Sequence, residues 1–89
     1  MRKFSVEEKL KRTMLKLSKK DTSLFNDLIR KIDEILNCWE INHYKNLRKP
    51  LQHLKRVRVK SSFVLTFRYI ESEDKVVFYD FDHHDRVYK

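Results

Sequence analysis

The chain has 89 residues and a formal net charge of +8 at pH 7. This length suits one small domain, so we expect a single domain over residues 1–89. No apolar run approaches the roughly 20 residues that span a membrane, and charge beginning at Arg2 argues against a secretory signal. A lone cysteine and the lack of glycine exclude an internal disulfide and glycine-rich phosphate loops. We therefore expect a cytoplasmic protein that would hold any phosphate with its side chains.

The positive charge is concentrated in one stretch of the chain. Residues 41–70 contain Lys and Arg but no Asp or Glu, whereas bases and acids cancel over the rest of the sequence. A surface of one sign attracts polyanions, of which phosphate polymers are the commonest. The alternative is a solvated strand face whose bases only discourage aggregation. The bases of this stretch are Lys45, Arg48, Lys49, Lys55, Arg56, Arg58, Lys60 and Arg68.

The first half of the chain shows helical periodicity after a short alternating segment at residues 3–6. Helical spacing begins at Glu7, pauses at residues 18–20 and resumes after a cap at Asp21 or Ser23. The first apolar stripe is Leu10, Met14 and Leu17, and the second is Leu24, Leu28, Ile32, Ile35 and Trp39. We expect the second stripe to lie in the core through Trp39 and the two helices to form an antiparallel αα-hairpin.

The second half changes to a period of two after an aperiodic loop at residues 42–50. In residues 56–60, Val57 and Val59 face one way while Arg56, Arg58 and Lys60 face the other. Residues 63–70 and 75–81 predict two more strands joined by a polar turn. The expected fold is a small α+β domain of order β-α-α-β-β-β. Its antiparallel sheet packs one face against the αα-hairpin and leaves the other face open and basic.

Titratable residues follow the last predicted strand. For His83, His84 and Asp85 a metal site is the weakest interpretation, because the other histidines lie on separate elements. The alternatives are solvated tail histidines or acid–base groups, since imidazole is the usual proton carrier for RNA cleavage at neutral pH. Tyr88 fits either a C-terminal anchor or a residue for base stacking or proton transfer. We predict no metal and no cofactor.

Together these features resemble a known family. Lys45-Asn46-Leu47-Arg48, the run Arg-Val-Arg-Val-Lys-Ser-Ser at residues 56–62 and the terminal Val87-Tyr88 carry the resemblance. They are similar to the RelE-like mRNA interferases of the RelE/ParE superfamily of toxin–antitoxin toxins. The resemblance covers nearly the full chain, and it rests on the combination of short motifs and the order of the elements.

The resemblance implies the toxin of a type II toxin–antitoxin system. Such a toxin is a ribosome-dependent endoribonuclease that cuts mRNA in the decoding site and is neutralised by an acidic, helical, RelB-like antitoxin. It also implies that Arg56 and Arg58 contribute to the site and that Tyr88 stacks on the cut nucleotide or helps activate it. The chain departs from the family at Val64, where an Arg is common. It departs again at residues 82–85, where the two histidines replace a second Arg.

The residue types suggest metal-independent cleavage by attack of the 2′-OH on the adjacent phosphate. Arg56, Arg58 and Arg86 would stabilise the developing negative charge, and His83, His84 or Tyr88 would relay protons. The bases expected to contact mRNA or the ribosome are Lys45, Arg48, Lys49, Lys55, Lys60 and Arg68. Two alternatives remain open: a ParE-like gyrase inhibitor and a non-catalytic RNA-binding module.

Overall fold

The computed structural model describes residues 1–87, so Tyr88 and Lys89 lie outside the described residues. The elements are β1 (Lys3–Val6), α1 (Glu8–Lys20), α2 (Thr22–Leu36), the 3₁₀ helix η1 (Ile41–His43), β2 (Lys55–Val59), β3 (Phe63–Ile70), η2 (Glu71–Glu73), β4 (Lys75–His83) and α3 (His84–Val87). The predicted β-α-α-β-β-β order is confirmed, with a short helix after the last strand. No helix within residues 1–87 is both long and apolar enough to pass through a bilayer.

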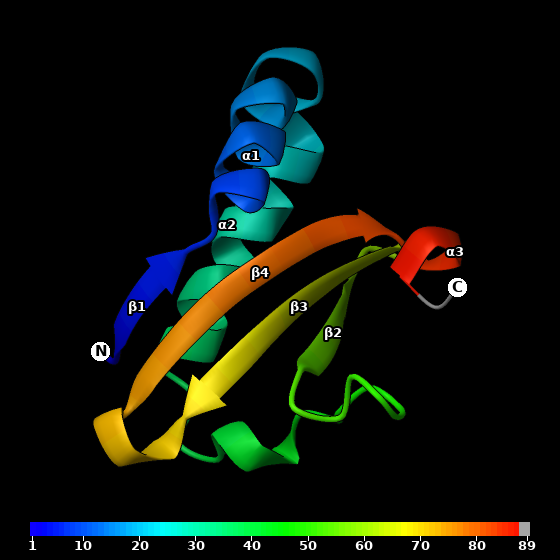
Figure 1. Ribbon diagram of the computed structural model, residues 1–89. Helices are drawn as coiled ribbons and strands as arrows, with labels where there is room; N and C mark the ends of the chain where they lie inside the picture. Colours follow the sequence, from blue (N-terminus) through cyan, green and yellow to red (C-terminus); the bar gives the residue numbers. More distant parts are fainter. Residues whose placement is uncertain (88–89) are drawn as a thin grey trace.

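The four strands form one sheet in the order β1-β4-β3-β2. β3 is antiparallel to both β2 and β4, as the short connections predict. β1 joins the other side of β4 and runs parallel to it. A parallel neighbour needs a long crossover connection, and the helices α1 and α2 lie between β1 and the later strands. The sheet is therefore mostly antiparallel, with the helical hairpin beside it (Figure 1).

Asp21 forms the tight corner between the two helices. Its carboxylate Oδ1 accepts a hydrogen bond from the backbone N–H of Leu24 at 3.1 Å, which caps the start of α2. Its own backbone N–H donates to the carbonyl of Leu17 at 2.9 Å, which closes the last turn of α1. One residue thus ends one helix and begins the next, and α1 and α2 lie side by side as a hairpin (Figure 1).

The core lies between the helical hairpin and one face of the sheet. Phe67 of β3 occupies its centre, with the ring of Phe78 at 6.1 Å and the ring of Tyr44 edge-on at 5.5 Å. The side chains with no solvent exposure are Leu10, Leu28, Ile35, Val64, Leu65, Phe67, Val76 and Phe78. The apolar stripes predicted from helical and strand periodicity supply most of them.

Trp39 is not part of the core, which corrects the predicted helical stripe. α2 ends at Leu36, and the Asn37 cap donates hydrogen bonds from its backbone and side chain to the carbonyl of Asp33. The chain then leaves the helix, so Trp39 no longer projects along the face of Ile35 and is 89% exposed. Periodicity alone extended the helix by one turn past its cap.

The second face of the sheet is less open than predicted. Val64 and Thr66 point away from the main core but are only 0% and 4% exposed. β3 has neighbours on both sides and α3 contacts both β3 and β4, so a side chain on this face is covered even where no long helix lies. On this face the bases lie mainly on the edge strand β2 and its preceding loop, and Arg68 of β3 is also exposed there.

Candidate nucleic-acid interface

A basic pocket of about 490 Å³ lies where the loop before β2 folds back toward that strand. Among the described residues that line it, four are bases and none is acidic. The lining consists of Asn46, Leu47, Arg48, Lys49, Pro50, Leu51, Arg56, Arg58 and Val87. The lining is therefore strongly cationic, while Leu47, Pro50 and Leu51 supply apolar surface. A pocket with both characters suits a nucleotide, whose phosphate is anionic and whose base has an apolar face.

Strand alternation aims two of these bases at the pocket. Arg56 is paired with Thr66 and Arg58 with Val64 in the antiparallel register of β2 and β3. Side chains directly opposite one another share a sheet face, so both arginines lie on the face that points away from the helical hairpin. This confirms the prediction that Arg56 and Arg58 share the face of β2 opposite Val57 and Val59. Arg58 Nη1 also donates to the carbonyl of Ser61 at 2.9 Å, which fixes part of its guanidinium.

Backbone hydrogen bonds bring the loop bases to the same place. The N–H of Arg56 donates to the carbonyl of Lys45 at 2.9 Å, and the N–H of Leu47 donates to the carbonyl of Leu54 at 2.8 Å. These bonds fold residues 45–54 along the open edge of β2. Arg48 and Lys49, at the tip of that loop, therefore line the pocket opposite the strand.

Lys55 lies inside the protein, although the sequence predicted an RNA contact for it. It is 8% exposed, and its Nζ donates to the carbonyl of Tyr44 and to Oδ1 of Asn46, each at 3.2 Å. Burial lowers the pKa of this ammonium from its ordinary value. The residue shares the inward parity of Val57 and Val59, a pattern that the run of neighbouring bases obscured. Its position ties the pocket loop to β2.

Lys60 also departs from the predicted row of strand bases. It follows the end of β2 with a left-handed φ of 55°, which breaks the alternation that would have aligned it with Arg58. Its Nζ lies 2.8 Å from Oδ2 of Asp27 on α2. The hydrogen bond from Lys60 lowers the pKa of the Asp27 carboxyl. Lys60 therefore faces the helical hairpin and is not among the residues that line the pocket.

The remaining predicted contact residues lie outside the pocket lining. Lys45 and Arg68 are exposed. Arg68 shares the strand face of Val64 and Thr66, as expected from alternation. Among the described residues, the pocket thus brings together Arg48, Lys49, Arg56 and Arg58 from the predicted set.

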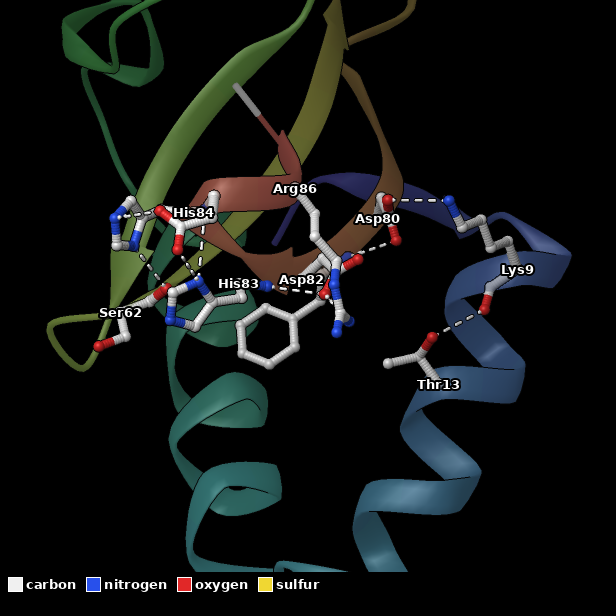
Figure 2. Close-up of polar contacts among 10 residues, drawn as sticks. Lys9, Thr13, Ser62, Asp80, Asp82, His83, His84 and Arg86 are labelled. Atoms are coloured by element: carbon white, nitrogen blue, oxygen red, sulfur yellow. Dashed lines mark hydrogen bonds and ion pairs between the residues drawn. The ribbon is translucent and has the colours of Figure 1, made fainter. Parts of the chain in front are cut away.

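The titratable residues near the C-terminus form a separate group. His83, His84 and Asp85, which we call the histidine turn, lie at the junction of β4 and α3. Neither histidine lines the basic pocket. Arg86 bonds Oδ1 of Asp82 at 3.1 Å (Figure 2). Val87 does line the pocket, and the next residue is Tyr88, which lies outside the described residues.

Sequence reasoning missed the apolar wall of the pocket. Leu47 is 8% exposed and Leu51 is 41% exposed; Leu47 lies within the aperiodic loop and Leu51 directly follows it. Apolar residues scattered in a basic, aperiodic loop were the available signal. Leu47 and Leu51 reach the pocket only because the loop folds back along β2, and periodicity does not predict the path of a loop.

Comparison with known proteins identifies the family. No protein-family model matches the chain. The chain is 42% identical over 89 residues to a protein of Methanocaldococcus jannaschii named "putative toxin RelE4", covering 100% of this chain and 93% of that protein. The chain belongs to the RelE-like toxins of the RelE/ParE superfamily. The resemblance seen in the sequence is thereby confirmed.

Solved structures of RelE-like toxins share this fold. The isolated Escherichia coli RelE toxin superposes with a TM-score of 0.71 and 17% identity, covering 93% of this chain and 84% of that one. The toxin–antitoxin complex RelBE2 of Mycobacterium tuberculosis gives a TM-score of 0.75 and 18% identity, covering 93% and 98%. The RelE-like α+β fold is therefore confirmed for a chain whose sequence has diverged far from both.

Proposed function

We propose that this protein is the toxin of a type II toxin–antitoxin system and cleaves mRNA bound to the ribosome. Membership of the RelE-like toxins supports the first part. The observation that carries the second is the basic pocket, where, within residues 1–87, four bases and apolar side chains meet without an acidic residue. Such a pocket attracts one nucleotide of an RNA chain and holds its phosphate beside cationic side chains.

The proposed reaction uses the RNA's own 2′-OH as the nucleophile. Its oxygen attacks the adjacent phosphorus, the bond to the 5′-oxygen breaks, and the products are a 2′,3′-cyclic phosphate and a 5′-OH. A base removes the 2′ proton and an acid returns one to the leaving oxygen. Arg56 and Arg58 would stabilise the charge that develops on the phosphate oxygens. Tyr88, which follows the pocket residue Val87, would stack on the nucleotide or supply a proton.

The placement of the bases refines their proposed roles. Arg48 and Lys49 would contact RNA directly because they line the pocket. Lys45 and Arg68 would contact the ribosome or more distant RNA from exposed positions. Lys55 would act by holding the pocket loop, and Lys60 by tying β2 to α2.

A cognate antitoxin is the proposed protein partner. The RelBE2 structure is a toxin–antitoxin complex. The present chain carries a net charge of +8, so an acidic, RelB-like helical protein would complement it electrostatically. We expect such an antitoxin to suppress the toxic effect when both proteins are produced together.

Induction in cells followed by mapping of mRNA 5′ ends tests the proposed activity. Wild type should arrest growth and create new 5′ ends within translated codons. Arg58→Ala and Tyr88→Ala should lose most of these ends, whereas Arg12→Ala is a matched control because Arg12 is exposed on α1. Tyr88→Phe separates the two roles of the tyrosine, because phenylalanine keeps base stacking and removes the phenol.

A non-catalytic RNA-binding module is the second candidate. It is favoured by one observation: neither histidine of the histidine turn lines the basic pocket among the described residues. Growth arrest without new 5′ ends, with Arg58→Ala still defective, would overturn the nuclease and support RNA binding alone. Loss of cleavage in His83→Ala or His84→Ala would instead give the imidazoles a part in proton transfer.

A further inference from the structure

The histidine turn gathers three metal-ligating side chains from consecutive positions. In a strand, neighbouring side chains point to opposite faces, so His83 and His84 would diverge if β4 continued. Instead α3 begins at His84, and the two imidazole rings stack with centroids 4.6 Å apart and an interplanar angle of 29°. Figure 2 shows the two rings side by side at this turn. The change from strand to helix is what brings the ligands together.

The potential ligand atoms of the histidine turn converge on one point. His84 Nε2 lies 3.0 Å from Asp85 Oδ1, and His83 Nδ1 lies 3.5 Å from Asp85 Oδ2. All three residues offer a ligand atom within 4.8 Å of the others. Two ligands of a tetrahedral zinc ion, with bonds near 2.0–2.1 Å, are separated by about 3.3 Å. The spacing is therefore close to that of a coordination shell.

Hydrogen bonds around His84 orient its free nitrogen toward the carboxylate. His84 Nδ1 lies 3.2 Å from the carbonyl oxygen of Ser62 (Figure 2). A carbonyl only accepts, so Nδ1 must carry the hydrogen. A neutral imidazole then has its lone pair on Nε2, the atom that faces Asp85. Metal-binding histidines commonly make this contact, in which the ring nitrogen that does not bind the metal donates to a backbone carbonyl.

The other imidazole also presents a lone pair. The backbone N–H of Asp85 donates to His83 Nδ1 at 3.3 Å, so Nδ1 is the acceptor nitrogen of that ring. A metal ion bound at Nδ1 would replace this hydrogen bond. The lone pair of His84 Nε2 and the Asp85 carboxylate lie 3.0 Å apart, and they repel unless a cation lies between them. A proton on His84 Nε2 would provide this positive charge. A divalent metal ion would provide a larger one.

The surroundings leave the histidine turn both supported and accessible. The Phe63 and His83 rings pack in a T-shaped arrangement with centroids 5.7 Å apart, which restrains the imidazole. Arg86 forms an ion pair with the nearby carboxylate of Asp82. Asp85 is therefore the carboxylate that belongs to the histidine turn. The side chains of His83 and His84 are 38% and 36% exposed. An ion can enter from solvent, and water can complete its coordination.

We propose that His83 Nδ1, His84 Nε2 and the Asp85 carboxylate bind a divalent first-row transition metal ion such as Zn²⁺. Nitrogen and carboxylate donors suit this class of ion, whereas Mg²⁺ prefers an all-oxygen shell. The bound ion would hold the start of α3, three residues before Val87 of the basic pocket. Metal binding at this site does not presuppose the proposed nuclease activity, and it is tested separately from it.

Titration of the untagged protein with Zn²⁺ by calorimetry tests this assignment. Wild type should bind one equivalent, and His83→Ala, His84→Ala and Asp85→Asn should each weaken binding roughly 10-fold or more. His53→Ala and His43→Ala are matched controls, because both histidines are exposed and lie outside the histidine turn. The His43 control also covers the nearby thiol, since Cys38 Sγ lies 3.7 Å from His43 Nδ1.

Long-range ¹H–¹⁵N spectra of the imidazoles identify the ligand atoms directly. Zn²⁺ should shift His84 Nε2 and His83 Nδ1 while His84 Nδ1 stays protonated. Circular dichroism should show that the variants keep the wild-type fold. Zn²⁺ binding that survives His84→Ala but fails in His43→Ala would overturn the assignment. So would a spectrum with no Zn²⁺-dependent shift and both nitrogens of His84 protonated, which would identify an imidazolium–carboxylate pair.

Discussion

The basic pocket draws its lining from residues 46–58 and from Val87, whereas the histidine turn consists of three consecutive residues. The pocket therefore exists only when the loop, β2 and the C-terminal helix are folded together. The histidine turn needs only the local change from strand to helix and one backbone partner, the carbonyl of Ser62. The two regions, which the expected cleavage reaction combines, therefore have different structural requirements. Changes to the scaffold should affect them differently.

Removal of a central core side chain should have the largest effect and should disrupt both regions together. Phe67 has no solvent exposure and packs against Phe78 and Tyr44. Phe67→Ala should lower the free energy of unfolding by about 3–5 kcal/mol, because it removes buried surface and leaves a cavity. Urea unfolding measures this, with Phe4→Ala as control because Phe4 is 50% exposed. Equal stability of the two variants would contradict this picture of the core.

Replacement of Lys55 should separate the two regions. Lys55→Met keeps the aliphatic stem but leaves the carbonyl of Tyr44 and the amide of Asn46 without their donor. Asn46 is exposed and can bond water, whereas the Tyr44 carbonyl is a buried acceptor. A buried acceptor without its donor costs about 1–3 kcal/mol, so the variant should be less stable and should bind RNA more weakly. Zn²⁺ affinity should stay unchanged in calorimetry. Weaker Zn²⁺ binding in a folded Lys55→Met protein would show that the histidine turn depends on the pocket loop.

The limit of the basic pocket can be tested with two bases that the sequence placed in one row. Arg58 lines the pocket, whereas Lys60 pairs with Asp27 on α2. For a single-stranded RNA oligonucleotide, Arg58→Ala should weaken binding and reduce the salt slope of log K by about 0.7, the value for one phosphate contact. Lys60→Ala should leave the slope unchanged. Equal salt slopes for both variants would show that Lys60 contacts RNA as Arg58 does, as periodicity predicted.

The smallest effect concerns pH and the contact between Lys60 and Asp27. The hydrogen bond from Lys60 holds the folded-state pKa of Asp27 below its ordinary value of 3.8. The stabilisation is therefore present above that ordinary value and is lost as the pH falls through the folded-state pKa. Lys60→Gln should be slightly less stable than wild type at neutral pH. This difference should disappear in acid, as followed by urea unfolding with Arg12→Gln as the control.

The sequence by itself determined the fold class and the two faces of β2. Helical spacing, the Asp21 cap and the change to a period of two depend on neighbouring residues, and the structure follows them closely. The alternation of Arg56 and Arg58 against Val57 and Val59 is equally local. Family membership was also readable, because it rests on element order and short motifs along the whole chain.

The tertiary structure decided which bases share a surface and which residues leave it. Lys55 is buried because its strand face meets the core, and Lys60 turns to α2 because the strand ends before it. The parallel pairing of β1 and the coverage of Val64 also depend on elements far away in the chain. Periodicity reports the direction of a side chain within its own element. It carries no information about the partner that element meets, and that partner decides whether a charge faces solvent, an opposite charge or the core.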